Sequence, residues 1–364
     1  MPELRTDRLA GRAVLVAEKR AERPDEFREL ASGEPASAGG NLGQNVTLHH
    51  PLAEAGSPSA PVCPFCPGQE QLTPPAVYEV HSANGEWQVR VVPNKYPAVT
   101  LTGDDEPVGE TARLGLIPAA EAASPPANAI APGLGVHEVI VETPRHIDRT
   151  SALSTTELRD VLNTYALRLR HWRALGRFAY GLVFKNQGRR AGASLAHLHS
   201  QFIALPTVPP AVAAELRRAE MEYRRDRNCP YCRLIQNERL RGERVIYDDN
   251  GFIAFCPFAS LQPYEVWLMP TDHQGSFDEL APDALDRLAE ALHAVAGRAE
   301  SVVADGAFNL MLRTAPWRVP CGDWSHWRIE LLPRAAALAG FELASGMFIN
   351  PVAPERAASK LRSI

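Results

Sequence analysis

The sequence predicts an α+β protein built from two similar units, each with a few antiparallel strands and one helix packed on them. The first observation is a repeat, in which a Cys-x-x-Cys pair, apolar runs and two histidines occur twice in the same order. His146 and His197 are 51 positions apart, and His273 and His326 are 53 apart. The second observation is that the apolar runs are short and rich in β-branched and aromatic residues, as strands are. Duplication explains this pattern better than coincidence.

The expected elements follow one order in an N-terminal half, residues 1–210, and a C-terminal half, residues 211–364. The strands are expected within residues 89–93, 137–146, 180–184 and 197–206 of the first half, and 252–257, 264–273, 308–312 and 326–333 of the second. Between the histidines of the first half, the capping-box pattern Ser154-x-x-Glu157 begins a helix. Pro282 begins the corresponding helix of the second half.

Composition excludes several classes of protein. The chain has 364 residues and a formal net charge of −5, so a nucleic acid is not expected as a partner. No stretch reaches the roughly 20 apolar residues that span a bilayer, and the N-terminus lacks the apolar core of a signal peptide. We expect a cytoplasmic protein with reduced cysteines and no membrane partner. Residues 31–61 and 100–133, rich in Pro, Gly, Ala and Ser, are expected to be long loops or linkers.

The paired cysteines favour metal binding. Two thiolates from one tight turn suit a tetrahedral zinc ion, and the repeat nominates two histidines to complete each site. The expected ligands are Cys63, Cys66, His146 and His197 in the first half, and Cys229, Cys232, His273 and His326 in the second. Buried apolar cysteines or a redox pair are the alternatives. Because four protein ligands close a site, both zinc ions are expected to be structural.

The motif His197-Leu198-His199-Ser200-Gln201 is expected on a strand, where side chains alternate between faces. His199 and Gln201 then share a face with the metal ligand His197. A neutral imidazole can attack an α-phosphorus and carry the nucleotidyl group, while the Gln201 amide can donate to a phosphate oxygen. The preceding Gly-containing loop supplies Asn186 and Ser194 as candidate phosphate contacts, with an ordinary turn as the alternative.

These motifs resemble those of galactose-1-phosphate uridylyltransferases and the related ADP-glucose phosphorylases, in the histidine-triad superfamily. Four further stretches carry the resemblance along the chain: residues 19–24, 63–68, 93–98 and 340–351. The resemblance implies a duplicated histidine-triad-like fold, a homodimer, and ping-pong transfer through a nucleotidyl group on His199. It also implies the first zinc quartet as assigned above, and a second zinc quartet in some members of the family.

The resemblance further implies which residues contact the substrates, a nucleotide sugar together with a sugar phosphate or phosphate. Phosphate and nucleotide contacts fall on Arg20, Arg23, Asn94, Asn186, Ser194 and Gln201, and the sugar-phosphate side falls around Phe341. Leu198 and Ser200 depart from the His-Pro-His-Gly-Gln pattern of uridylyltransferases. The Ser before Gln is closer to the ADP-glucose phosphorylase pattern.

Four functions are compatible with the sequence. The first expectation is transfer of the UDP-glucose:hexose-1-phosphate uridylyltransferase type. The alternative within the superfamily is phosphorolysis, with ADP-glucose or another nucleotide as the donor. A zinc-stabilised nucleotide-binding protein without catalysis is a third reading. A hydrolase is disfavoured, since Gln201 stands where hydrolases of the superfamily have a third histidine.

Overall fold

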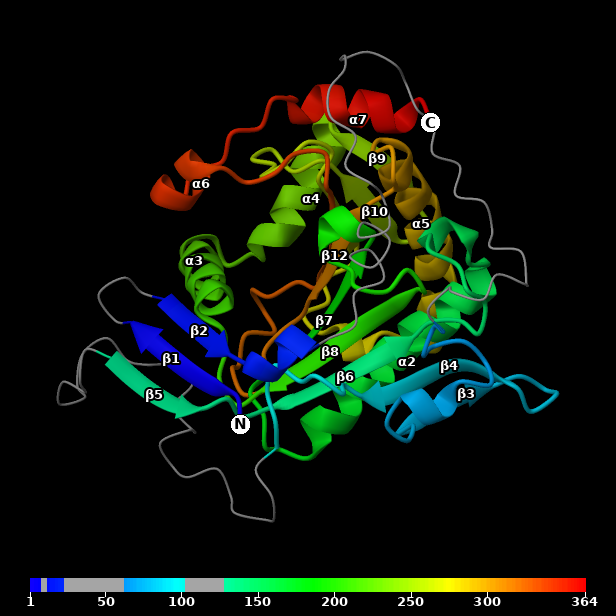
Figure 1. The fold of residues 1–364 in the computed structure, drawn as a ribbon. Coiled ribbons are helices and arrows are strands. Elements are labelled where there is room, and N and C mark those ends of the chain that lie inside the picture. Colours follow the sequence, from blue (N-terminus) through cyan, green and yellow to red (C-terminus); the bar gives the residue numbers. More distant parts are fainter. Residues whose placement is uncertain (8–11, 23–61, 102–127) are drawn as a thin grey trace, which may run out of the picture.

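The structure is a computed structural model that describes residues 1–7, 12–22, 62–101 and 128–364 (Figure 1). Arg23, residues 31–61 and most of residues 100–133 lie outside the described residues. Within the described part of the chain, no helix is both long and apolar enough to cross a membrane.

A ten-stranded antiparallel sheet forms the centre of the molecule, and its strand order is mirrored about the middle. In spatial order, the strands are β3 (Tyr78–His81), β4 (Trp87–Pro93), β6 (Val136–Val141), β8 (His199–Leu205), β7 (Tyr180–Gln187), β12 (Phe308–Arg313), β13 (Arg328–Pro333), β11 (Val266–Pro270), β10 (Phe252–Phe255) and β9 (Val245–Asp249). The five strands of each repeat occupy one side, and β7 pairs with β12 where the repeats meet. The predicted α+β class with antiparallel strands is confirmed.

Two long helices cover one face of this sheet. They are α2 (Thr155–Ala174) and α5 (Pro282–Ser301), which contact each other and the strands of their own repeats. The predicted capping box forms, because Ser154 accepts from the Glu157 backbone N–H and the Glu157 side chain accepts from the Ser154 N–H. The leucine and alanine stripes of both helices are buried against the sheet in one large apolar core. This core holds the sheet rigid beneath the opposite face.

The remaining described elements surround this sheet. A second sheet has the order β2 (Arg12–Val16), β1 (Glu3–Asp7), β5 (Asn128–Pro132), and the other helices are α3 (Pro210–Asp226), α4 (Pro230–Arg241), α6 (Gly340–Ser345) and α7 (Pro354–Arg362). Short 3-10 helices are η1 (Glu18–Glu22), η2 (Glu70–Leu72), η4 (Thr150–Ala152), η5 (Arg189–Ala191) and η6 (Phe277–Glu279). Figure 1 shows α6 standing away from the body of the protein.

Four strand predictions need correction at their ends, because β11 and β13 stop short of His273 and His326 as β6 and β8 stop short of His146 and His197. β6 ends at Val141, so His146 lies in the loop that follows. β8 begins at His199, so His197 lies in the bend before it instead of on the strand. The bend is held because the Leu198 N–H donates to the Ile147 carbonyl, 2.9 Å away. Leaving the flat strand lets His197 turn toward the loop that carries His146.

Candidate functional site

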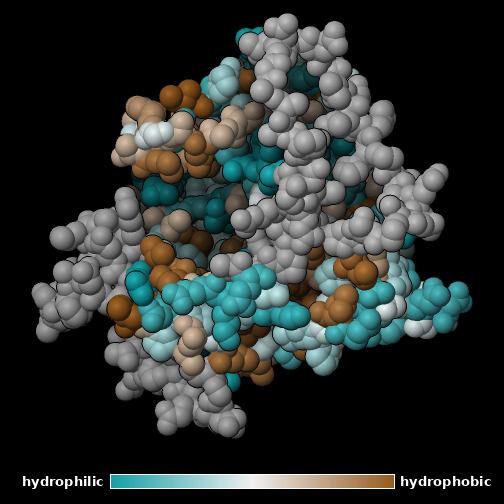
Figure 2. Space-filling model, viewed as in Figure 1, coloured by the Kyte–Doolittle hydropathy of each residue, from teal (hydrophilic) through white to brown (hydrophobic). Residues whose placement is uncertain are grey.

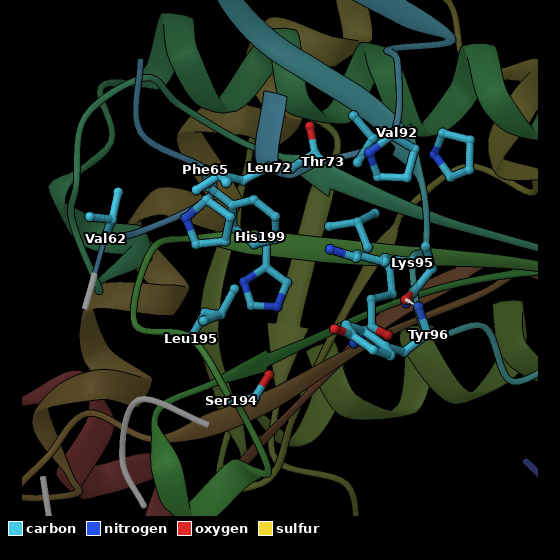
Figure 3. Close-up of a pocket in the computed structure, with 16 residues that line it drawn as sticks. Val62, Phe65, Leu72, Thr73, Val92, Lys95, Tyr96, Ser194, Leu195 and His199 are labelled. Carbon is cyan, nitrogen blue, oxygen red and sulfur yellow. Dashed lines mark hydrogen bonds between the residues drawn. The ribbon is translucent and has the colours of Figure 1, made fainter. Parts of the chain in front are cut away.

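A pocket of about 300 Å³ opens on the sheet face opposite α2. Its walls come from the turn that follows Cys63, the end of β4 and the start of β8 with its preceding loop. Figure 3 shows the His199 imidazole in the middle, with Phe65 above it, Ser194 below it and Lys95 beside it. The floor is therefore formed by polar side chains of β8, and most of the wall is apolar.

The His199 ring is oriented by the backbone. Its Nδ1 lies 2.8 Å from the carbonyl oxygen of His197. A carbonyl can only accept, so Nδ1–H donates and the neutral ring keeps its lone pair on Nε2. Phe65 packs against the same ring, with centroids 5.2 Å apart. An imidazole held in this tautomer in a largely apolar pocket can act as a nucleophile through Nε2.

Gln201, two residues further along β8, lines the same pocket, as strand alternation predicts. Its Oε1 lies 3.0 Å from Nε2 of His137, a buried residue on β6. The Asn94 Nδ2 atom lies 3.0 Å from the same imidazole nitrogen. Burial is the main cause that lowers the pKa of His137 to about 4, so the ring is neutral at physiological pH. The Nε2 atom of His137 therefore has two amide groups as its polar neighbours, and one of them belongs to Gln201 of the motif.

The first cysteine–histidine quartet is assembled as predicted. Ligand atoms of Cys63, Cys66, His146 and His197 all lie within 4.8 Å of one another. Cys66 Sγ is 3.3 Å from His146 Nδ1 and 3.7 Å from His197 Nδ1. A tetrahedral zinc ion would separate its sulfur and nitrogen ligands by roughly 3.5 Å. His197 also donates Nε2–H to the Thr143 carbonyl at 2.8 Å, which presents Nδ1 to the ion. These four residues could hold a metal ion.

The second quartet repeats this arrangement. Cys229, Cys232, His273 and His326 lie equally close, and Cys232 Sγ is 3.4 Å from His273 Nδ1. His326 donates Nε2–H to the Pro270 carbonyl at 3.0 Å. Pro270 stands three residues before His273, as Thr143 stands three before His146. The two halves therefore build their candidate metal sites on the same plan.

The halves differ at the position that His199 occupies in the first. Two positions after the metal ligand, His199 of the first half is matched by Arg328 of the second, and Gln201 is matched by Glu330. Arg328 is buried, 2.6 Å from Glu330 and 2.8 Å from Glu215 of α3, and its guanidinium lies over the Trp267 ring at 4.3 Å. Paired charges fill this place, so one half alone presents an imidazole.

The other predicted contacts fall in different places. Ser194 and Asn94 line the pocket, and Arg20 reaches its edge by donating to the Tyr96 carbonyl at 3.0 Å. Asn186, on β7, accepts a hydrogen bond from Asn309 and is outside the lining. Phe341 is half exposed on α6, also outside the lining.

Sequence reasoning gave no role to Phe65, Lys95 and His137. Phe65 and Lys95 stand inside the quoted stretches 63–68 and 93–98, so a signal was present for both. His137 is the first residue of the expected strand segment 137–146, but only the pairing of β6 with β8 in three dimensions brings it to Gln201.

Behind the pocket, a buried ion pair supports the strand from the helix side. Lys185 Nζ lies 2.5 Å from Glu142 Oε2, and both side chains are almost fully buried. The other Glu142 oxygen accepts from the Tyr165 hydroxyl at 2.8 Å and from the Ser200 hydroxyl. Ser200 stands between His199 and Gln201, so this network holds the central part of the motif in place.

Comparison with known proteins gives consistent matches. Residues 1–209 match the family described as galactose-1-phosphate uridyl transferase, N-terminal domain, and residues 135–363 match a domain of unknown function, DUF4921. ADP-glucose phosphorylase of Arabidopsis thaliana is 30% identical over 100% of this chain and 93% of its own length. Galactose-1-phosphate uridylyltransferase of Thermotoga maritima is 28% identical over 63% of this chain and 74% of its own.

Solved structures agree over the full length. The ADP-glucose phosphorylase of Arabidopsis thaliana with bound ADP-glucose superposes with a TM-score of 0.70 at 28% identity, covering 100% of this chain and 99% of that one. A uridylyltransferase superposes with a TM-score of 0.72 at 27% identity, covering 99% and 97%.

Proposed function

Because the chain belongs to the galactose-1-phosphate uridylyltransferase family and is a nucleotidyltransferase-like enzyme, we propose that it carries a nucleotidyl group on His199. The observation that carries the proposal is the 2.8 Å contact between His199 Nδ1 and the His197 carbonyl, from which the tautomer of the ring follows. Its Nδ1–H is held by the His197 carbonyl, so Nε2 has the lone pair inside a pocket that also contains Gln201 and Ser194.

In the first half-reaction, His199 Nε2 attacks the α-phosphorus of a nucleotide sugar and forms a P–N bond. The bond between the α-phosphorus and the bridging oxygen breaks, and the sugar 1-phosphate leaves with that oxygen. In the second, an oxygen of the acceptor phosphate attacks the same phosphorus and the P–N bond breaks, which frees the imidazole. The Gln201 amide and the Ser194 hydroxyl supply donors for the phosphoryl oxygens, where charge gathers in the transition state.

We propose ADP-glucose as the donor and inorganic phosphate as the acceptor, so that the products are glucose 1-phosphate and ADP. The sequence alone put uridylyl transfer between UDP-glucose and a hexose 1-phosphate first. The full-length likeness to ADP-glucose phosphorylase supports the alternative better, since the curated uridylyltransferase relative from Thermotoga matches over 63% of the chain. Ser200 before Gln201 supports the same choice.

We propose zinc in both quartets, where it would draw together loops far apart in the sequence. Each ion would have four protein ligands, which would make its role structural. The division of the chain into two halves at residue 210 is likewise a proposal. No step of the reaction is assigned to either ion.

We also propose a homodimer. The α6 segment exposes six large apolar residues: Leu338, Phe341, Leu343, Met347, Phe348 and Ile349. Figure 2 shows hydrophobic side chains gathered at this projecting segment. Such a patch marks an interaction surface, and a partner protomer could bring Phe341 to the sugar side of the substrate.

The test of the covalent step is intact-protein mass spectrometry after brief incubation with ADP-glucose or UDP-glucose in separate tubes, without phosphate. We expect an adduct of one AMP with ADP-glucose, and its loss when phosphate is added. His199→Asn removes the nucleophile, while His81→Asn, an exposed histidine on β3, is the matched control. A UMP adduct alone would restore the uridylyl reading. An adduct on His199→Asn would refute the covalent role.

A further inference from the structure

His137 has a place in the site that its position in the sequence does not reveal. It lies on β6, is 5% exposed, and stands opposite Ile203 of the neighbouring strand β8. Both ring nitrogens have polar neighbours at 3.0 Å. Nδ1 receives the backbone N–H of Ala98, and Nε2 faces Gln201 Oε1 and Asn94 Nδ2.

The backbone decides where the proton of this ring sits. A backbone N–H can only donate, so Nδ1 must accept from Ala98 and the single proton of the neutral ring is on Nε2. A ring with both nitrogens protonated could not accept that bond, and burial, which lowers the pKa of His137 to about 4, agrees with a neutral ring.

That proton in turn decides which way Gln201 points. The Nε2–H group can donate only to an acceptor, so it bonds the Gln201 oxygen and not the Asn94 amide nitrogen, although both lie at 3.0 Å. The oxygen and nitrogen of a glutamine amide are interchangeable in shape, and the hydrogen-bond partner is what sets their order. With the oxygen held against His137, the NH₂ end of Gln201 is left for the pocket.

We propose that His137 is a positioning residue that fixes the carboxamide of Gln201 so that its NH₂ group donates into the phosphate pocket. The chain of contacts runs from the Ala98 backbone through His137 to Gln201, two residues from His199. A rotated carboxamide would present its oxygen to the phosphate and repel it. The inference rests on the proposed nucleotidyl transfer, because it assigns Gln201 to the phosphoryl group of that reaction.

A double-mutant cycle tests the role. His137→Leu keeps an apolar side chain but removes the donor, whereas His137→Gln keeps an N–H that reaches the Gln201 oxygen. Measured as single-turnover adduct formation at saturating ADP-glucose, His137→Leu should be slower by about tenfold or more. In a Gln201→Ala background the same change should cost less than about threefold, because nothing remains to be oriented. His137→Gln should recover most of the rate, and His81→Leu is the control.

Each outcome decides something. An equal loss in both backgrounds, or no loss in either, would overturn the positioning role, and metal content and thermal midpoint recorded for each variant identify a merely structural loss. Neutron diffraction of the wild-type protein gives a reading independent of turnover. A deuteron on Nδ1 of His137, or the Gln201 nitrogen facing the ring, would overturn the inference. A wild-type protein that forms no adduct with either donor refutes the proposed function instead, and the neutron map then decides the orientation alone.

Discussion

Replacing Lys185 with methionine tests the buried Lys185–Glu142 ion pair that lies behind β8. Lys185 is 2% exposed and Glu142 is fully buried, with 2.5 Å between Nζ and Oε2. Methionine keeps most of the volume of the stem but removes the ammonium group. The Glu142 carboxylate then keeps only the Tyr165 and Ser200 hydroxyls as donors on its other oxygen.

The expected cost follows from the burial of the remaining charge. Removing one partner of a buried ion pair destabilises a protein by about 3–5 kcal/mol, because the other charge is left desolvated. We expect a loss in this range in the free energy of unfolding at pH 7. The double variant Glu142→Gln/Lys185→Met has no charge to leave unpaired and should regain all but about 1–2 kcal/mol.

Urea unfolding of the metal-loaded protein, followed by tryptophan fluorescence, measures these differences. Arg190→Met is the matched control, because Arg190 and its partner Asp305 are 49% and 41% exposed, and an exposed pair contributes no more than about 1 kcal/mol. The reasoning is refuted if Lys185→Met costs no more than this control, or if the double variant is no more stable than the single one.

Two further predictions concern metal and assembly. Cys63→Ser and Cys229→Ser should each lower the zinc content by one ion per chain and lower the thermal midpoint, since metal binding is coupled to folding. Elemental analysis checks this, and wild-type protein that is stable and free of zinc would contradict it. Leu343→Glu, on the exposed face of α6, should convert a dimer to a monomer in light scattering, while Leu240→Glu, exposed on α4, should not. A monomeric wild-type protein would contradict the proposed dimer.

The family and the assembly of both cysteine–histidine quartets could be predicted, because the duplicated sequence repeats the same residue types at matched spacing. The full-length match confirms the family, and the assembled quartets agree with the spacing argument. That His199 and Gln201 share one pocket could also be predicted, since strand alternation places them on one face. The ends of β6 and β8 could not be predicted, because His146 and His197 lie outside the strands, where they face the cysteines.

Other parts of the site depend on contacts that no local pattern encodes. His137 and Gln201 are 64 positions apart and meet only because β6 pairs with β8 in one register. Lys95 and Phe65 become pocket residues because two loops converge on β8. Phe341 carried part of the resemblance but lies outside the pocket lining, so the role proposed for it would need the proposed partner protomer, which a single sequence does not describe.

The charged neighbours of Arg328 limit which side chains the second half can accept at the position that matches His199. Replacing Arg328 with histidine would remove the cation shared by the buried Glu330 and the partly exposed Glu215, and Tyr231 of α4 would still donate to Glu215 beside the vacated space. Its carboxylate neighbours would have to change as well before an imidazole could be tolerated there, since removing one partner of a buried ion pair is destabilising. The mirrored sheet therefore repeats its framework without repeating the candidate reactive group, because the charged neighbours of the second position suit a guanidinium and not a neutral imidazole.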